Sequence, residues 1–99
     1  MYGTVATFRV QPGKAEELQK IAAEDAAKIA GLAFEYTYQT DNDPNVLIIV
    51  VAFENKEAYW ANANSPEQAA RYERFRALLT SDPEWHDGEI VSSSTGKSM

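Results

Sequence analysis

An eight-residue run, Val46 to Phe53, is apolar at every position. Side chains along a β-strand point alternately to the two faces of a sheet, and a strand covered on one face alternates apolar with polar residues. This run therefore predicts a strand that is covered on both faces. Since 99 residues can supply helices for one face of a small sheet, we expect a second copy of the chain to cover the other.

Before this run the pattern predicts a strand from Thr4 to Val10, a turn, and a helix from about Ala15 to Ala30 with Gly31 as its C-cap. A second strand, Leu32 to about Thr40, should form a hairpin with the apolar run through the turn residues 41–45. The residues that share the expected buried face of the helix are Leu18, Ile21, Ala22, Asp25 and Ile29.

After the run we expect a short helix from Lys56 to Ala63 and a longer one from Pro66 to Leu79, which Ser65 caps. Residues 80–88 are expected to be a loop, and Glu89 to Ser93 a short last strand. The sequence thus predicts one domain over residues 1–93, followed by a flexible polar tail over 94–99. The element order β-α-β-β-α-β predicts an α+β, ferredoxin-like fold, with a four-stranded antiparallel sheet and its helices on one side.

Composition narrows the possible functions. The chain has no cysteine, which excludes disulfides and thiolate chemistry, and its net charge of −6 argues against nucleic-acid or anionic-membrane partners. No apolar segment approaches the ~20 residues of a membrane helix, and no secretory signal is visible, so we expect a cytoplasmic protein. One histidine and scattered carboxylates predict no metal site, and isolated glycines predict no nucleotide cofactor.

Four stretches together resemble the antibiotic biosynthesis monooxygenase family of dimeric α/β-barrel proteins. They are the end of the first strand at residues 10–14, the hairpin at 34–45, the segment 53–59 leading into Asn64-Ser65-Pro66, and the segment 81–91. The resemblance implies a homodimer in which two sheets pack face to face, with a ligand cavity between each sheet and its helices. It also implies oxidation of an aromatic, phenolic or quinol-type substrate by dioxygen, without a prosthetic group.

A haem-degrading branch of that family uses an Asn on the first strand, with a Trp and a His on the second helical segment. The first strand here offers Ala6, Thr7 and Phe8, while Asn62 and Tyr72 align with the Trp and His. This departure argues against haem degradation.

The candidate catalytic residue is His86, since histidine is the side chain that most readily exchanges a proton near neutral pH. Its neighbours Trp85 and Asp87 leave two interpretations, a general base or a histidine in a turn. Trp60 and Trp85 could stack on a flat ligand or pack over the sheet and the partner. Tyr36 and Tyr38 line the cavity if their face meets the helices, and belong to the interface if it meets the partner.

Tyr72 and Arg76 lie one turn apart on the second long helix. Arg76 could bind an anionic substrate oxygen, or pair with Glu73 or Asp82. Asn62 could donate a hydrogen bond to a ligand or act as a cap. Two other functions remain open: a non-catalytic, ligand-binding dimer, and a proton-transfer enzyme such as a lactone isomerase or a dehydratase.

Overall fold

A computed structural model describes residues 1–96, with the exception of the Asp25 side chain. The polar tail expected over residues 94–99 therefore lies partly outside the described residues, as does the expected inward position of Asp25. The strands are β1 (Tyr2–Arg9), β2 (Leu32–Gln39), β3 (Val46–Phe53) and β4 (Glu84–Glu89). The helices are α1 (Ala15–Ala26), α2 (Lys56–Ala63) and α3 (Pro66–Arg76).

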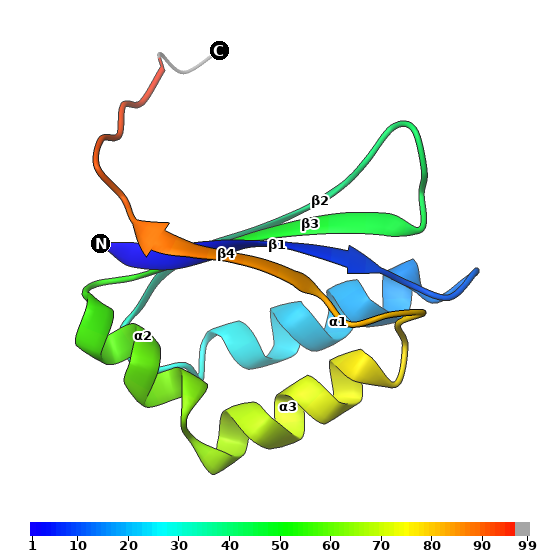
Figure 1. Ribbon diagram of the computed structural model, residues 1–99, viewed down its shortest axis with the longest axis horizontal. Coiled ribbons are helices and arrows are strands. Elements are labelled where there is room, and N and C mark those ends of the chain that lie inside the picture. The colour runs from blue at the N-terminus through cyan, green and yellow to red at the C-terminus, as the bar shows by residue number, and fades with distance from the viewer. Residues whose placement is uncertain (97–99) are drawn as a thin grey trace.

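The four strands form one antiparallel sheet in the order β2-β3-β1-β4, which confirms the predicted ferredoxin-like, α+β fold. All three helices lie on one side of this sheet (Figure 1). None of the helices among residues 1–96 is both long enough and apolar enough to cross a lipid bilayer.

The core fills the space between sheet and helices. Leu18 of α1 and Leu47 of β3 are fully buried, and Phe8 and Phe75 lie against each other across this layer. Ile49 belongs to the same cluster, so one alternate set of β3 side chains meets the helices. In the other set, Ile48 and Val50 are only partly buried in the single chain.

The prediction for the last strand is wrong in position. β4 begins at Glu84, five residues before the expected Glu89, and pairs along β1 from Thr7 to Tyr2. Every residue of β4 is exposed, so the strand carries no apolar alternation that would reveal it in the sequence. Pairing with residues Tyr2 to Thr7 of β1 sets its position instead.

Both long helices end earlier than predicted. α1 ends at Ala26, because the following residues form a turn in which the Ile29 amide donates to the Ala26 carbonyl at 3.3 Å. α3 ends at Arg76, and the chain after it is tied to the end of β1: the Gln11 amide donates to the Leu78 carbonyl at 2.8 Å.

Gly31 leads the chain into β2 rather than capping α1 directly. Its φ is +79°, a left-handed conformation that favours glycine. Its carbonyl accepts a hydrogen bond from the Glu54 amide at 2.9 Å, and a Cβ atom here would lie 2.8 Å from the Cβ of Ala58 in α2. Gly31 therefore allows α2 to approach the sheet closely.

Replacing Gly31 tests this close approach, and Gly13 offers a matched control. Gly13 also has a positive φ, of 83°, but a Cβ atom there meets nothing within 4 Å. We expect Gly13→Ala to lower the free energy of unfolding by about 1 kcal/mol from backbone strain alone. Gly31→Ala should cost a further ~1–3 kcal/mol from overpacking against α2. Urea denaturation measures both, and equal losses would contradict the proposed contact.

Candidate functional site

A cavity of about 430 Å³ lies between the sheet and the helices. β1 and β3 contribute its sheet-side surface through Thr4, Ala6, Ile49 and Val51, and α2 and α3 contribute the helix side. The alternation of side chains in β4 directs Trp85 and Asp87 to the same side, because these residues pair with Ala6 and Thr4 of β1.

The walls of this cavity are rich in aromatic rings. Phe8 makes edge-to-face contacts with Phe75 and Trp85, at centroid distances of 5.8 and 5.7 Å. Trp85 also lies 6.4 Å from the ring of Tyr72. Offset and edge-to-face packing of this kind holds large side chains in defined orientations. The aromatic residues that line the cavity are Phe8, Phe53, Tyr59, Trp60, Tyr72, Phe75 and Trp85.

The junction between α2 and α3 positions the amide side chains of the site. Ser65 Oγ accepts a hydrogen bond from the Gln68 amide at 3.1 Å and donates one to the Asn62 carbonyl at 2.8 Å. This N-cap ends one helix and starts the next within two residues. Asn62 and Gln68 then face each other, and Asn62 Nδ2 donates to Gln68 Oε1 at 3.3 Å.

The polar contacts of Tyr59 place a carboxylate at the cavity. The Tyr59 hydroxyl donates to Asp87 Oδ1 at 2.6 Å, which joins α2 to the edge strand β4. Burial raises the pKa of Tyr59 well above its ordinary value, and the adjacent Asp87 carboxylate raises it further. Tyr59 is therefore a neutral hydrogen-bond donor throughout the physiological pH range.

A second carboxylate, Glu35 of β2, lines another part of the cavity together with Arg71 of α3. Burial raises the pKa of Glu35 above its ordinary value, and the nearby Arg71 guanidinium partly offsets this effect. Arg71 also donates a hydrogen bond to Gln68 Oε1, the same oxygen that accepts from Asn62. Guanidinium, amide and carboxylate groups are thus gathered at one part of an otherwise apolar cavity.

Four of the residues predicted from the sequence line this cavity: Trp60, Asn62, Tyr72 and Trp85. Two others, Tyr36 and Tyr38, lie on the opposite face of the sheet, because Tyr36 pairs with Val50 and Tyr38 with Ile48. Their side chains are 63% and 52% exposed. The sequence left open whether these tyrosines face the helices or a partner. In the structure they lie on the face of the sheet without helices, so they do not line the cavity.

The structure places His86, the candidate catalytic residue, outside this cavity. His86 lies within β4 rather than in a loop, and it pairs with Val5, whose side chain is on the face opposite the helices. It is exposed and does not line the cavity. The strand register is the physical reason, since the neighbours Trp85 and Asp87 occupy the inner face.

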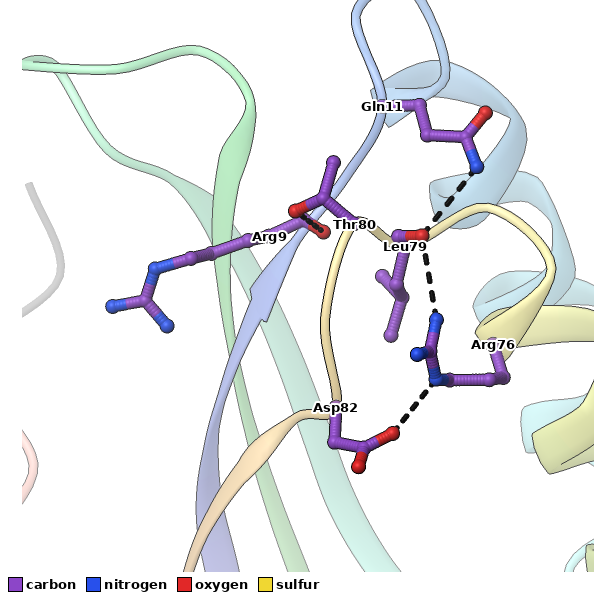
Figure 2. A network of polar contacts seen from close by, with 6 residues as sticks. All are labelled: Arg9, Gln11, Arg76, Leu79, Thr80 and Asp82. Carbon is purple, nitrogen blue, oxygen red and sulfur yellow. Dashed lines mark hydrogen bonds and ion pairs between the residues drawn. The ribbon is translucent and has the colours of Figure 1, made fainter.

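Arg76 takes part in a different set of contacts, shown in Figure 2. Its Nε donates to Asp82 Oδ1 at 2.8 Å, and one terminal nitrogen donates to the Leu79 carbonyl at 3.4 Å. Gln11 donates to the same carbonyl at 3.4 Å. Arg76 therefore connects the end of α3 to the loop before β4 and does not line the cavity.

The sequence interpretation missed Glu35, Arg71, Tyr59 and Asp87 as cavity residues. A signal for Glu35 was present. Successive side chains of β2 point to opposite faces of the sheet. If Tyr36 and Tyr38 lie on the face without helices, Glu35 must lie on the face that meets the helices. Asp87 could be assigned to the cavity only once the position of β4 was known, because its segment was expected to be a loop. Among the residues whose side chains are described, no group of three or more histidine and carboxylate side chains could hold a metal ion.

The fold and the aromatic cavity define an α+β protein with a ligand-sized site between its sheet and helices. Over residues 1–74 the sequence matches the antibiotic biosynthesis monooxygenase family, and the chain belongs to this family. No curated protein is significantly similar to it in sequence.

Solved structures agree with this assignment at the level of the fold. A protein of the same family name from Chloroflexus aurantiacus J-10-fl is 24% identical with a TM-score of 0.80, covering 95% of this chain and 96% of its own. One from Deinococcus radiodurans is 14% identical with a TM-score of 0.81, covering 99% and 100%. A variant of SnoaB, a cofactor-independent oxygenase from Streptomyces nogalater, is 18% identical with a TM-score of 0.79, covering 93% and 94%.

The raised pKa of Glu35 predicts that the stability of the protein depends on pH. Because the folded protein binds this proton more tightly than the unfolded chain, stability falls as the pH rises above the ordinary value of 4.5. Gln does not titrate, so the Glu35→Gln variant lacks this loss of stability. We therefore expect its free energy of unfolding, relative to that of the wild type, to increase as the pH rises from about 4 to 7. Urea denaturation across this range measures the gain.

Glu24→Gln is the matched control. Glu24 of α1 lies at the surface, with its carboxylate 3.6 Å from the guanidinium of Arg74 in α3, so this variant removes the same charge outside the cavity. Its stability relative to the wild type should not rise with pH. An equal rise in both variants would show that net charge, and not burial of Glu35, is the cause.

Proposed function

We propose that this protein oxidises a small aromatic substrate, a phenol, quinol or anthrone, with dioxygen and without a prosthetic group. The observation that carries the proposal is the aromatic cavity of about 430 Å³ with a few polar groups at its walls. Such a volume suits a ligand of two or three fused rings, and aromatic walls bind flat rings through stacking and edge contacts. Membership of the family and the resemblance of the fold to SnoaB support the same chemistry.

The cavity favours this reaction by desolvation and hydrogen bonding. A substrate methylene or hydroxyl group first loses a proton, and the resulting carbanion or phenolate transfers electrons to dioxygen. In the oxidation of a methylene group to a carbonyl, the carbon loses two hydrogens and gains one oxygen atom, and the second oxygen leaves as water. Exclusion of water would protect the anion, and Asn62 and Arg71, which line the cavity, would donate hydrogen bonds to the negative oxygen.

Oxygen consumption tests the reaction. With anthrone or a reduced naphthoquinone as the substrate, we expect the protein to consume one dioxygen per product, and turnover to cease under anaerobic conditions. Product formation at the same rate without oxygen would contradict the proposal and favour proton-transfer chemistry. Binding of every probe without turnover would favour a ligand-binding protein.

Two neighbouring alanines of α3 test whether the cavity is the site. Ala69 lines the cavity, whereas Ala70 does not. We expect Ala69→Trp to fill the cavity and to lower kcat/KM at least about tenfold, while Ala70→Trp retains activity. Thermal unfolding of both variants shows whether the fold is kept. Equal activity of a folded Ala69→Trp variant would place the reaction elsewhere.

We also propose that the protein is a homodimer through the face of the sheet without helices. This face carries Val5, 42% exposed, together with the exposed Tyr36 and Tyr38 and the partly buried Ile48 and Val50. A contiguous apolar and aromatic face of this kind is characteristic of an interface. A second copy would provide the cover that the outer side of β3 lacks.

A single charge in the centre of this face tests the dimer. Val50 lies between Val5 and Tyr36 in the register of the sheet, so Val50→Lys would bury an unpaired charge in the interface. We expect sedimentation at micromolar concentration to give twice the chain mass for the wild type and a monomer or unfolded chain for this variant. Ala23→Lys adds the same charge at an exposed position of α1 and should remain dimeric. A monomeric wild type would contradict the proposal.

A further inference from the structure

We propose that the Glu35 carboxylate accepts the proton of the substrate hydroxyl group, and that Arg71 stabilises the anion that remains. This assignment rests on the oxidation proposed above, and it names the residue that starts the reaction. Both residues line the cavity, one from the sheet and one from the helix layer.

The position of Glu35 in the sheet directs its carboxylate into apolar surroundings. Glu35 pairs with Val51 of β3, and both residues are on the side that faces the helices. Ile29 and Leu32 line the same cavity nearby in the chain. A carboxylate placed among aliphatic side chains is poorly hydrated, and a ligand hydroxyl can replace the lost water contacts.

The charged and titratable groups around this cavity distinguish Glu35 from the other carboxylate. Among the described side chains, those that line it besides Glu35 are Tyr59 of α2, Arg71 and Tyr72 of α3, and Asp87 of β4. Asp87 already accepts the Tyr59 hydroxyl at 2.6 Å, so one of its oxygens is engaged within the protein. Glu35 has the cationic Arg71 near it, which is the arrangement needed to hold a proton acceptor and an oxyanion side by side.

The step is a simple proton transfer. The proton moves from the substrate O–H to a Glu35 oxygen, and the bonding electron pair stays on the substrate oxygen. No bond forms between protein and substrate. The phenolate of a quinol then transfers two electrons and its remaining hydroxyl proton to dioxygen and becomes the quinone. The hydroperoxide anion takes up the proton held by Glu35 and leaves as hydrogen peroxide. Burial strengthens Glu35 as a base, because a carboxylate with a raised pKa binds the transferred proton more tightly.

Steady-state kinetics of Glu35→Gln test the role in turnover. With a reduced naphthoquinone, which carries the hydroxyl group that this step requires, we expect kcat to fall about 100-fold while KM stays within about threefold, since a general base contributes to the transition state. Glu24→Gln removes a carboxylate that also faces an arginine of α3, but at the surface, and should keep the wild-type kcat.

Binding of para-nitrophenol provides a second readout that does not depend on turnover. Its colour reports whether the bound molecule is a phenol or a phenolate. A carboxylate beside the hydroxyl disfavours the phenolate, and Arg71 favours it. We therefore expect Glu35→Gln to lower the apparent pKa of bound para-nitrophenol by about one pH unit, and Glu24→Gln to leave it unchanged.

The two measurements separate this inference from the proposed function. If the wild type consumes no oxygen but Glu35→Gln still shifts the ionisation of para-nitrophenol, the oxidation is wrong and the placement of Glu35 at the bound hydroxyl stands. If Glu35→Gln turns over at the wild-type rate and leaves the ionisation unchanged, Glu35 is not the proton acceptor, while the oxidation stands.

Discussion

The pairing of β1 with β3 on one side and β4 on the other determines which side chains meet the helices. In both ladders the register is antiparallel and continuous over the length of the shorter strand. A slip of one residue in β4 would exchange the two faces and bring His86 to the cavity in place of Trp85 and Asp87. Strand register therefore determines the composition of the cavity wall, because alternation along β4 decides which of its side chains face the helices.

Much of the fold could be predicted from the sequence because its strongest signals are local. The apolar run gives β3 its bounds at Val46 and Phe53, and the caps Asn55 and Ser65 give α2 and α3 their first residues. β4 could not be found in the same way. It is an exposed edge strand with Trp, His, Asp and Gly in succession, a composition typical of a loop, and only its long-range hydrogen bonds with β1 make it a strand.

The cavity shows the same division between local and long-range information. Tyr72 could be selected because helical spacing places it on an apolar helix face. Trp60 could be selected because its large ring suits a flat ligand, and Asn62 because it lies near the break between two helices. Arg71 could not, since an arginine on a helix is usually solvated. Glu35 could be assigned to the helix side only through the alternation of β2, and its proximity to Arg71 depends on the tertiary arrangement of α3 and the sheet. Sequence patterns thus find the walls of this site more readily than its ionisable groups.

Glu35 and Tyr36 are neighbours in β2, and they contribute to opposite faces of the sheet, one to the cavity and one to the outer face. Glu35 faces the helices and is exposed to the cavity, while Tyr36 faces the uncovered side of the sheet. A second subunit packed on that outer face would restrict movement of β2 relative to β3. It would thereby help to fix the distance between Glu35 and α3, the helix that carries Arg71. A dimer through the sheet would then contribute to the geometry of the cavity without supplying a residue to it, because the strands that form its interface also form the cavity wall.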